Sequence, residues 1–369
     1  MKKIITNPKN LSEQRQGQDT KLNTKIEDLS KPESPKSQLQ ENEKIDSNKN
    51  LFLTKTANEW IDEAKNRAIP KMLFGEFWLE GEICILFADS NLGKSIIAVQ
   101  IGDSITKGIP INGFKLEALK QPILYFDFEL SDKQFENRYS VNFSNHYQFN
   151  DNFKRVEINP DADIPEKQSF EDHLNIELEK EIVRTQTKIL IIDNLTYLRN
   201  ETEKAKNALP LMKQLKALKK KYNLSILVLA HTPKRDLSKP ITSNDLAGSK
   251  MLMNFCDSVF TIGESSSDKG KRYLKQIKAR NTEILYDSEN IIVCQIEKPV
   301  NFLQFKFVEL GTELDHLKQF TKKDKEKIKI AVLELTDKGV SNVEIGLKLG
   351  IHESTVRKYK KQNDSLSGN

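Results

Sequence analysis

The sequence predicts an α/β protein in which a mainly parallel β-sheet is flanked by helices. Short, continuous, β-branched apolar runs alternate with helical patterns from about residue 70 to residue 270, and such runs are typical of strands covered on both faces. After Gly270 the pattern changes to strand-like runs separated by turn residues, which predicts a terminal set of antiparallel strands. The 369 residues allow one full-sized domain with smaller appendages.

The expected elements follow one another as strand and helix in turn. The expected parallel strands begin at Ile83, Pro122, Lys188, Ser225 and Asp257. The expected helices begin near Lys94, Ser131, Phe170, Ala205 and Asn244. The expected antiparallel strands begin at Arg272, Ile291 and Leu303. This order requires βαβ units, and therefore a sheet with helices on its faces.

Composition divides the chain into four parts. Residues 1–50 have no aromatic side chain and no sustained apolar period, so we expect a disordered tail, either plain or used as a tether or partner-binding arm. A short amphipathic segment from Thr56 leads into the core domain, which we place at 51–316. A charged linker, 317–323, then precedes a small helical segment, 324–369.

Several classes of protein are disfavoured by the sequence. No apolar run approaches the ~20 residues of a membrane helix, and no signal-peptide pattern follows the first lysines. We therefore expect a cytoplasmic protein without a membrane partner. Cys84, Cys256 and Cys294 lie far apart, and two of them fall in strand-like runs, so we expect core residues rather than metal ligands or disulfides.

A phosphate-binding loop follows the first parallel strand. The motif runs Ala88, Asp89, Ser90, Asn91, Leu92, Gly93, Lys94, Ser95, and it fits G-x-x-x-x-G-K-[ST] with alanine in place of the first glycine. Backbone N–H groups of such a loop face the phosphates of ATP, Lys94 reaches the β and γ oxygens, and the Ser95 hydroxyl binds Mg²⁺. The alternative is a chance Gly-Lys-Ser in a strand-to-helix turn, and alanine tolerates positive φ less well than glycine.

Carboxylates at two other strand ends complete the predicted site. Asp193 ends the apolar run from Lys188, where it can hold a water of the Mg²⁺ shell. Asn194 follows it, so the general base must come from elsewhere. Glu129 ends the strand after the phosphate-loop helix and is the candidate base, with Asp127 on the same strand face as a possible assistant. Either carboxylate could instead cap the next helix.

These motifs, in this order, resemble the RecA-like ATPases. The resemblance covers about residues 70–310 and rests on the phosphate loop, Phe-Asp-Phe-Glu-Leu-Ser, Leu-Ile-Ile-Asp-Asn, Leu-Ala-His-Thr-Pro-Lys and Leu-Ala-Gly-Ser-Lys. Within that family the chain looks closest to the RepA-like group of hexameric helicases and mobile-element ATPases. The resemblance implies that Glu129 is the hydrolytic base and that His231, with Lys234 nearby, senses the γ-phosphate.

The resemblance also implies a basic finger on a late strand. Lys278 and Arg280 match its place, and a cation supplied to the neighbouring subunit's nucleotide would neutralise charge on the transferred phosphoryl group. A solvated basic strand edge is the alternative interpretation. With a finger, activity requires a homo-oligomer, expected to be a hexamer.

The C-terminal segment resembles a helix-turn-helix. Residues 321–361 hold 11 Lys and Arg against 6 Asp and Glu, an excess equal to the net +5 of the whole chain, which favours a polyanionic partner. Ser341 with Glu344 forms a capping box, and a small or apolar residue stands at every required position, namely Ile345, Gly346, Leu349, Gly350, Ile351, Val356 and Tyr359. The second helix would present to DNA the residues Ser354, Thr355, Arg357, Lys358 and Lys361. A helical hairpin for protein contacts is the alternative.

Three functions remain open at this stage. The first is an ATP-driven DNA motor or helicase for replication or mobilisation of a plasmid or mobile element, with single-stranded DNA in the ring and duplex DNA on the C-terminal helices. The second is an ATP-switched DNA-binding regulator that unwinds nothing. The third is a signalling or partner-remodelling ATPase whose C-terminal helices contact protein.

Overall fold

The computed structural model describes residues 51–163, 165, 169–194, 208–233, 235–247, 249–319 and 322–367. The predicted tail at 1–50, Lys234 and the expected helix start at Ala205 lie outside these residues. The chain divides into two units, 1–67 and 68–369, and each is treated by itself. In the first unit, α1 (Ala57–Lys65) begins at the amphipathic segment, with a capping box between Thr56 and Glu59.

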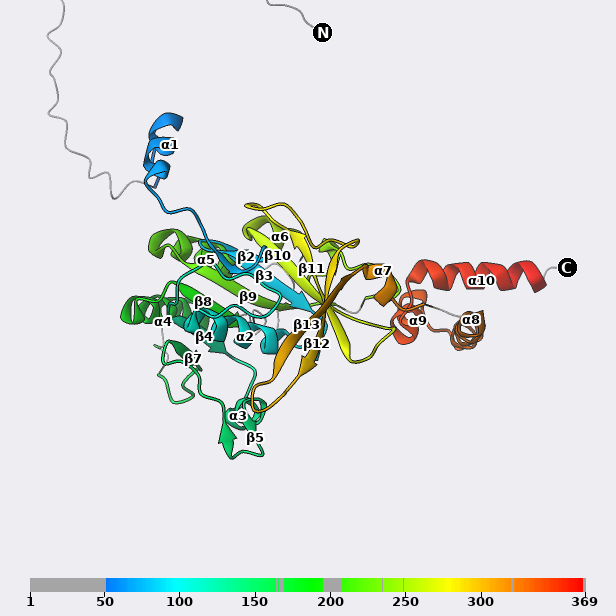
Figure 1. Ribbon diagram of the computed structural model, residues 1–369. Coiled ribbons are helices and arrows are strands. Elements are labelled where there is room, and N and C mark those ends of the chain that lie inside the picture. The colour runs from blue at the N-terminus through cyan, green and yellow to red at the C-terminus, as the bar shows by residue number, and fades with distance from the viewer. Residues whose placement is uncertain are drawn as a thin grey trace, which may run out of the picture. The chain divides into compact units, whose positions relative to one another are not determined.

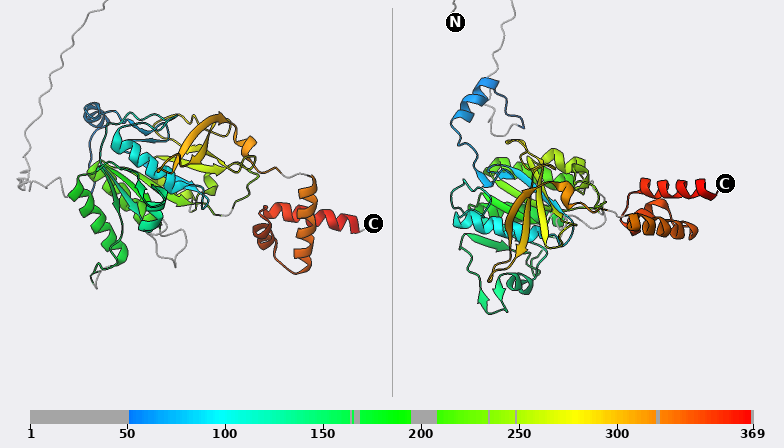
Figure 2. Two further views of the ribbon diagram at one scale, coloured as in Figure 1. Left: turned by 60° about the horizontal axis from the view of Figure 1, so that its bottom comes forward. Right: turned by 45° about the vertical axis from the view of Figure 1, so that its right-hand side comes forward.

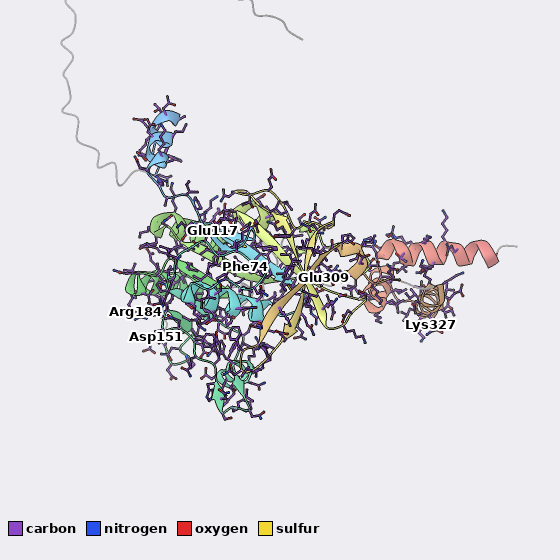
Figure 3. All side chains as sticks on the ribbon, viewed as in Figure 1. Phe74, Glu117, Asp151, Arg184, Glu309 and Lys327 are labelled. Carbon is purple, nitrogen blue, oxygen red and sulfur yellow. The ribbon has the colours of Figure 1, made fainter. Side chains whose placement is uncertain are left out.

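The second unit is built on a nine-stranded sheet (Figure 1) with the order β13-β12-β11-β10-β3-β9-β8-β4-β7. Six neighbouring strands run parallel, namely β10 (Ser258–Glu264), β3 (Ile83–Ala88), β9 (Ser225–His231), β8 (Ile189–Asp193), β4 (Ile123–Asp127) and β7 (Phe153–Val156). Three antiparallel strands extend the sheet beyond β10, namely β11 (Lys271–Lys278), β12 (Ile291–Glu297) and β13 (Gln304–Gly311). Figure 3 labels Asp151, beside β7, and Glu309, on β13, and these two strands stand at the ends of the strand order.

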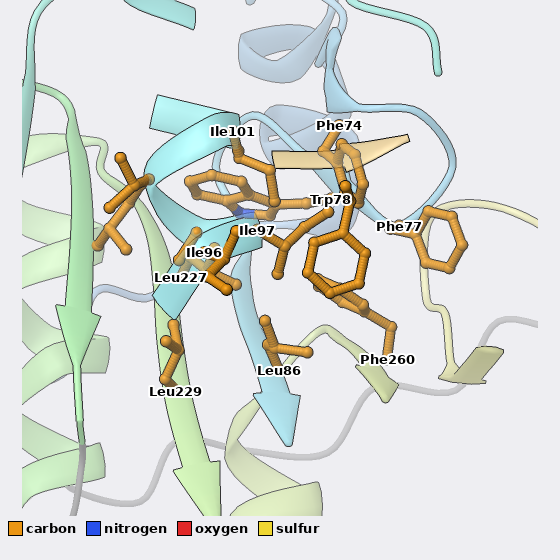
Figure 4. Packing of buried hydrophobic residues seen from close by; sticks show 14 of the residues in the cluster. Phe74, Phe77, Trp78, Leu86, Ile96, Ile97, Ile101, Leu227, Leu229 and Phe260 are labelled. Atoms are coloured by element: carbon orange, nitrogen blue, oxygen red, sulfur yellow. The ribbon is translucent and has the colours of Figure 1, made fainter. Parts of the chain in front are cut away.

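The sheet is covered on both faces (Figure 2) because its strands are apolar on both sides. One face packs against α2 (Lys94–Lys107), and the other against α4 (Phe170–Thr185), α5 (Ala208–Tyr222) and α6 (Ser249–Phe255). Figure 4 shows the first face, where Ile96, Ile97 and Ile101 of α2 gather with Leu86 and Trp78. Trp78 is wholly buried in this cluster, so its ring contributes apolar area to the packing of α2 on the sheet.

Smaller elements surround this core. Two short antiparallel pairs are β1 (Met72–Phe74) with β2 (Trp78–Leu79), and β5 (Ser140–Val141) with β6 (Asn145–His146). The short helices are α3 (Asp132–Arg138), a 3-10 turn at Ser243–Asp245 and α7 (Glu313–His316). Cys84, Cys256 and Cys294 are free and buried, as expected.

The C-terminal residues form three helices with a small apolar core of their own. These are α8 (Lys322–Asp337), α9 (Asn342–Leu349) and α10 (Glu353–Ser367). Val332, Ile345, Ile351 and Val356 are buried together. The capping box of Ser341 and Glu344 is present, and Gly350 ends α9 in the left-handed conformation.

Gly346 explains the close approach of α9 to the turn that follows it. A Cβ atom on this residue would lie 2.8 Å from the carbonyl oxygen of Ile351. A larger side chain would therefore push the turn away from α9, so the small residue at this position has a steric reason.

The predicted α/β class, a mainly parallel sheet flanked by helices, is confirmed. All five predicted parallel strands and all three antiparallel ones are present. The helix expected near Asn244 is wrong in its start, because the chain first makes a 3-10 turn there and α6 begins only at Ser249. β7 was not predicted, since FKRV is only four residues long, places two charged residues between two apolar ones and lies at the sheet's edge.

Among the described residues, no helix combines the length and the apolar character needed to cross a membrane.

Candidate active site

The phosphate-binding motif joins β3 to α2 at the carboxyl end of the parallel strands. Ala88 is the last residue of β3, so alanine suffices there because the strand conformation needs no positive φ. The left-handed residues are Asn91, with φ 64°, and Gly93, with φ 96°. A Cβ on Gly93 would lie 2.8 Å from the ring of Phe305, so both conformation and space require glycine there.

Lys94 is the first residue of α2 and is buried. Its Nζ donates to the carbonyl oxygens of Ala88, at 3.0 Å, and Asp89, at 3.1 Å, and lies 3.3 Å from His231 Nδ1. Burial lowers the pKa of Lys94, while the negative charges of Glu129, Asp193 and Asp89 raise it. The ammonium group of Lys94 is therefore bound by uncharged carbonyl oxygens. A phosphate oxygen could replace these carbonyls and would form a stronger, charge-assisted hydrogen bond.

Asp193 ends β8 and turns its carboxylate toward the phosphate loop. Tyr125 donates its hydroxyl to Asp193 Oδ2 at 2.6 Å, which fixes the carboxyl group. Within the described part of the chain the other oxygen, Oδ1, is buried and has no hydrogen-bond partner. Burial raises the pKa of Asp193 to about 6, although the hydroxyl groups of Ser95 and Tyr125 act in the opposite direction and lower it. An unpaired carboxylate oxygen next to a Ser95 hydroxyl fits the oxygen ligands that Mg²⁺ prefers.

Glu129, Asn194 and His231 form a cluster facing Lys94. Asn194 donates its amide to Glu129 Oε1 and lies 2.9 Å from His231 Nε2. His231 Nε2 is also 3.3 Å from Glu129 Oε1. The hydrogen bond from His231 lowers the pKa of Glu129, which keeps this carboxylate ionised, while burial acts the other way. β9 lies between β3 and β8, and this order places His231 between Lys94 and Glu129.

The carboxylate oxygens of Asp127 accept hydrogen bonds from the backbone and from Arg155. Its Oδ1 accepts the backbone N–H groups of Glu129, at 3.2 Å, and Leu130, at 3.0 Å, and its Oδ2 accepts Arg155 Nε at 2.9 Å. These bonds shape the turn that carries Glu129. Asp127 thus stabilises the turn that carries Glu129, and both of its carboxylate oxygens accept hydrogen bonds there.

Lys278 and Arg280 lie at the opposite end of the parallel strands. Lys278 pairs with Val259, which pairs with Ile85 near the start of β3, so its main chain is roughly 10 Å along the strand from Ala88. Lys278 Nζ donates to the carbonyl oxygens of Met253 and, at 2.8 Å, Cys256. Arg280 forms a 3.2 Å ion pair with Asp257, and its side chain is 48% exposed. The structure does not bring either cation to the phosphate loop of the same chain.

The five residues predicted to face DNA lie on α10. Ser354, Arg357, Lys358 and Lys361 are exposed, and Thr355 is partly so. Arg357 pairs with Glu353 one turn earlier at 2.6 Å, and Ser354 Oγ lies 2.8 Å from His352 Nδ1. The remaining apolar side of the helix contributes Val356 to the small core, so the polar side chains stay available to a partner.

Three supporting residues were missed by the sequence reasoning. The sequence showed only that Asn194 cannot be the general base, whereas the structure shows that its amide bridges Glu129 and His231. Tyr125 and Arg155 hold Asp193 and Asp127 from strands that are distant in sequence. Tyr125 stands inside an apolar strand run, where a hydroxyl needs a partner, and this was the available signal.

A family model and a solved structure are similar to parts of this chain. Residues 53–236 match a family model described as an AAA domain. The crystal structure of a KaiC-like protein from the hyperthermophilic archaeon Pyrococcus horikoshii OT3 is similar over 62% of this chain and 90% of its own, with 15% sequence identity and a TM-score of 0.40. No curated protein matches the chain.

The matched range contains every residue of the cluster at the carboxyl ends, whereas Lys278, Arg280 and the C-terminal helices lie beyond it. A strand, a phosphate loop and a buried lysine with two strand-end carboxylates beside it are the parts that nucleotide binding requires. Residues 53–236 are therefore similar to an AAA domain, and this match, together with the residues of the site, supports a P-loop ATPase.

Proposed function

We propose that the protein hydrolyses ATP at the carboxyl ends of the parallel strands, and that it uses the turnover to act on DNA. The observation that carries the first part is the convergence of Lys94, Asp193, His231 and Glu129 on one point. Lys94 and the backbone N–H groups that follow Gly93 would bind the phosphates. Ser95 and Asp193 would hold Mg²⁺, which supplies charge neutralisation on the β and γ oxygens.

Glu129 would act on the attacking water. Its carboxylate is kept ionised by His231 and oriented by Asn194. In the reaction the water oxygen bonds to the γ-phosphorus, the bond from that phosphorus to the β–γ bridging oxygen breaks, and the water proton moves to Glu129. ADP and phosphate are the products. Tyr125 and Arg155 contribute by holding the two strand-end aspartates in place.

We also propose that the protein assembles into a homo-oligomer. Arg280 cannot serve the phosphate loop of its own chain, because it lies at the other end of the strands. A homo-oligomer, in the form of a hexameric ring, would place it against a neighbour's nucleotide. The RepA-like subgroup, among the RecA-like ATPases, is the assignment that predicts this arrangement.

DNA is the proposed partner. The polar face of α10 carries four exposed residues that DNA contacts can use, and the C-terminal segment holds the chain's whole charge excess. We place duplex DNA on these helices and single-stranded DNA in the ring. The role would be replication or mobilisation of a plasmid or mobile element.

A pair of assays separates this role from its alternatives. ATP turnover is measured with and without single-stranded DNA, and strand displacement is then measured on a forked duplex. Stimulation together with unwinding supports the motor. Duplex binding without unwinding supports an ATP-switched regulator, and indifference to all DNA supports a partner-remodelling ATPase. The mass of the particle with a non-hydrolysable ATP analogue reports ring formation.

A further inference from the structure

The loop after β9 contacts both the phosphate loop and the end of the core domain. We call residues 235–241 the connecting loop. It begins four residues after His231, and Ile241 ends it shortly before the 3-10 turn. The two ends of the loop are fixed by different buried side chains, and a tyrosine lies between these side chains.

At its first end the connecting loop is tied to the phosphate motif. The guanidinium of Arg235 forms an ion pair with Asp89, with 3.7 Å between Nε and Oδ2. The Arg235 side chain is only 6% exposed, so this pair is poorly screened by solvent. Burial raises the pKa of Asp89, and the positive charges of Arg235 and Lys94 lower it. The charge of Asp89 is thus shared between the loop and the lysine that binds phosphate.

At its other end the connecting loop is tied to α7. The backbone N–H of Ile241 donates to Glu313 Oε1 at 2.7 Å, and the carbonyl of Ile241 accepts Lys275 Nζ at 2.8 Å. Lys275 and Glu313 also form an ion pair in which both side chains are buried. In addition, the N–H of Lys318 donates to the carbonyl of Leu237 at 3.0 Å. These bonds hold the segment that leads from the core domain into the C-terminal helices.

Tyr273 links the two ends. Its hydroxyl donates to Glu313 Oε1 at 3.1 Å, and the ring is buried. Burial raises the pKa of Tyr273, the charge of Glu313 raises it further, and Arg235 lowers it. The hydroxyl thus binds the carboxylate of α7, and its pKa also responds to the positive charge of Arg235, the residue that pairs with Asp89 of the phosphate loop. A buried network of this kind transmits a change at one member because each group has few alternative partners.

We propose that Arg235 and Tyr273 are positioning residues that couple the nucleotide site to α7 and the chain leading into the C-terminal helices. Phosphate binding draws Lys94 away from the Asp89 carbonyl and from His231, and it brings negative charge close to the Asp89 carboxylate. Arg235 is the group that responds, because it is the buried cation paired with Asp89. Its shift changes the hydrogen bonding of Tyr273 and Glu313, and with it the hold on Ile241 and Lys318. This inference rests on the proposed nucleotide site.

Hydrogen–deuterium exchange of the 369-residue chain tests the coupling. Exchange is measured in peptides covering 88–95, 236–247 and 312–319, without nucleotide, with ADP and with a non-hydrolysable ATP analogue. The peptide 298–304, which contains the Leu303 amide bonded to Arg138, serves as the internal control for general stabilisation. In the wild type we expect a nucleotide to change exchange in 236–247 and 312–319 by about fivefold or more relative to the change in this control peptide.

The deciding variant is Tyr273→Phe, which keeps the ring and removes the linking hydroxyl. We expect it to bind a fluorescent ADP analogue as the wild type does and to keep the response of 88–95, while 312–319 no longer responds. The matched control is Tyr222→Phe, which removes a hydroxyl donated to Glu179 at 2.5 Å outside the network and should respond like the wild type. If Tyr273→Phe fails to fold, Arg235→Gln replaces it, and the expected outcome is the loss of the nucleotide response at 312–319.

The outcomes are distinct. A wild type whose 88–95 peptide responds while 312–319 changes no more than the control peptide overturns the coupling and leaves the nucleotide site intact. A Tyr273→Phe protein that responds at 312–319 like the wild type overturns the linking role of the hydroxyl. A wild type that binds no nucleotide at all overturns the proposed site, and the coupling with it.

Discussion

The two ends of the same parallel sheet carry different kinds of charged cluster. At the carboxyl ends, Lys94, Glu129, Asp193 and His231 face one another across four neighbouring strands. At the amino ends, Lys278 and Arg280 face the carbonyl groups of α6 and the carboxylate of Asp257. The first cluster is aimed at a common point, whereas the second is satisfied by its own chain or open to solvent. Convergence, rather than charge alone, thus distinguishes the nucleotide site.

The amino-end cations also differ from each other. Lys278 donates to carbonyl groups at the end of α6, where a cation is favoured by the helix dipole. Burial lowers its pKa, and the nearby positive charge of Arg280 lowers it as well. Arg280 is more exposed; it forms an ion pair with Asp257 and donates to the carbonyl oxygen of Asn254 at 3.4 Å. Of the two, Arg280 is the better candidate to reach a neighbouring subunit, and Lys278 is the better candidate for holding α6.

The largest effect is expected from Lys94→Ala. Because Lys94 is the buried cation nearest both carboxylates, its loss removes the phosphate contact, and ATP binding and turnover should become undetectable. Binding of a fluorescent nucleotide and phosphate release measure this. Lys107→Ala, at the other end of α2 and paired with Asp103, is the matched control. Normal turnover in Lys94→Ala would place the active site elsewhere.

Glu129→Gln should separate binding from hydrolysis. The amide keeps the size of the side chain but cannot take the proton of the attacking water, so turnover should fall about 10²- to 10⁴-fold while ATP still binds. Phosphate release in a single turnover is the measurement. Glu136→Gln, on the exposed helix α3, should change turnover little. Unchanged turnover in Glu129→Gln removes it as the base.

Arg280→Ala tests whether the amino-end cluster acts between subunits. If it does, turnover should fall by roughly 10-fold or more, since a cation in trans stabilises charge on the phosphoryl group. Mixing Arg280→Ala with Lys94→Ala subunits should restore part of the activity, because some interfaces then combine an intact loop with an intact finger. If the mixture is no more active than the two variants measured separately, Arg280 does not act on the nucleotide of a neighbouring subunit. Lys278→Ala should mainly lower the melting temperature.

The smallest expected effect is a pH dependence set by Asp193. Its pKa is raised to about 6, so the carboxyl group takes up a proton as the pH falls through that value, and Mg²⁺-dependent nucleotide binding should weaken there. Stability should show the opposite sign, because the folded state holds this proton more tightly than the unfolded chain and loses stability as the pH rises toward about 6.

Asp193→Asn removes the titrating group and provides the check. Nucleotide affinity is measured with Mg²⁺ and with a chelator at several pH values, and unfolding by urea is followed in parallel. The variant should lose both slopes. A wild-type affinity that does not change through about pH 6 would show that another group holds the metal.

Local patterns were sufficient to predict eight of the nine strands of the large sheet, the phosphate loop and the caps. The run from Ile83 and the glycine-lysine-serine that follows it are adjacent in sequence, so the loop could be found without any long-range contact. The capping box of Ser341 and Glu344 is equally local. The role of Asp127 was harder to predict, because its partner Arg155 lies on β7, a short edge strand without a clear pattern.

The sequence by itself determined the phosphate-loop motif and its place between a strand and a helix, because the strand, the turn and the helix N-terminus are encoded within a dozen neighbouring positions. Only the tertiary structure decided which side chains share that site. The strand order brings His231 between Lys94 and Glu129, and it leaves Arg280 at the far end of the same strands. Strand order depends on the packing of apolar faces that are far apart in sequence, so it cannot be predicted from short motifs.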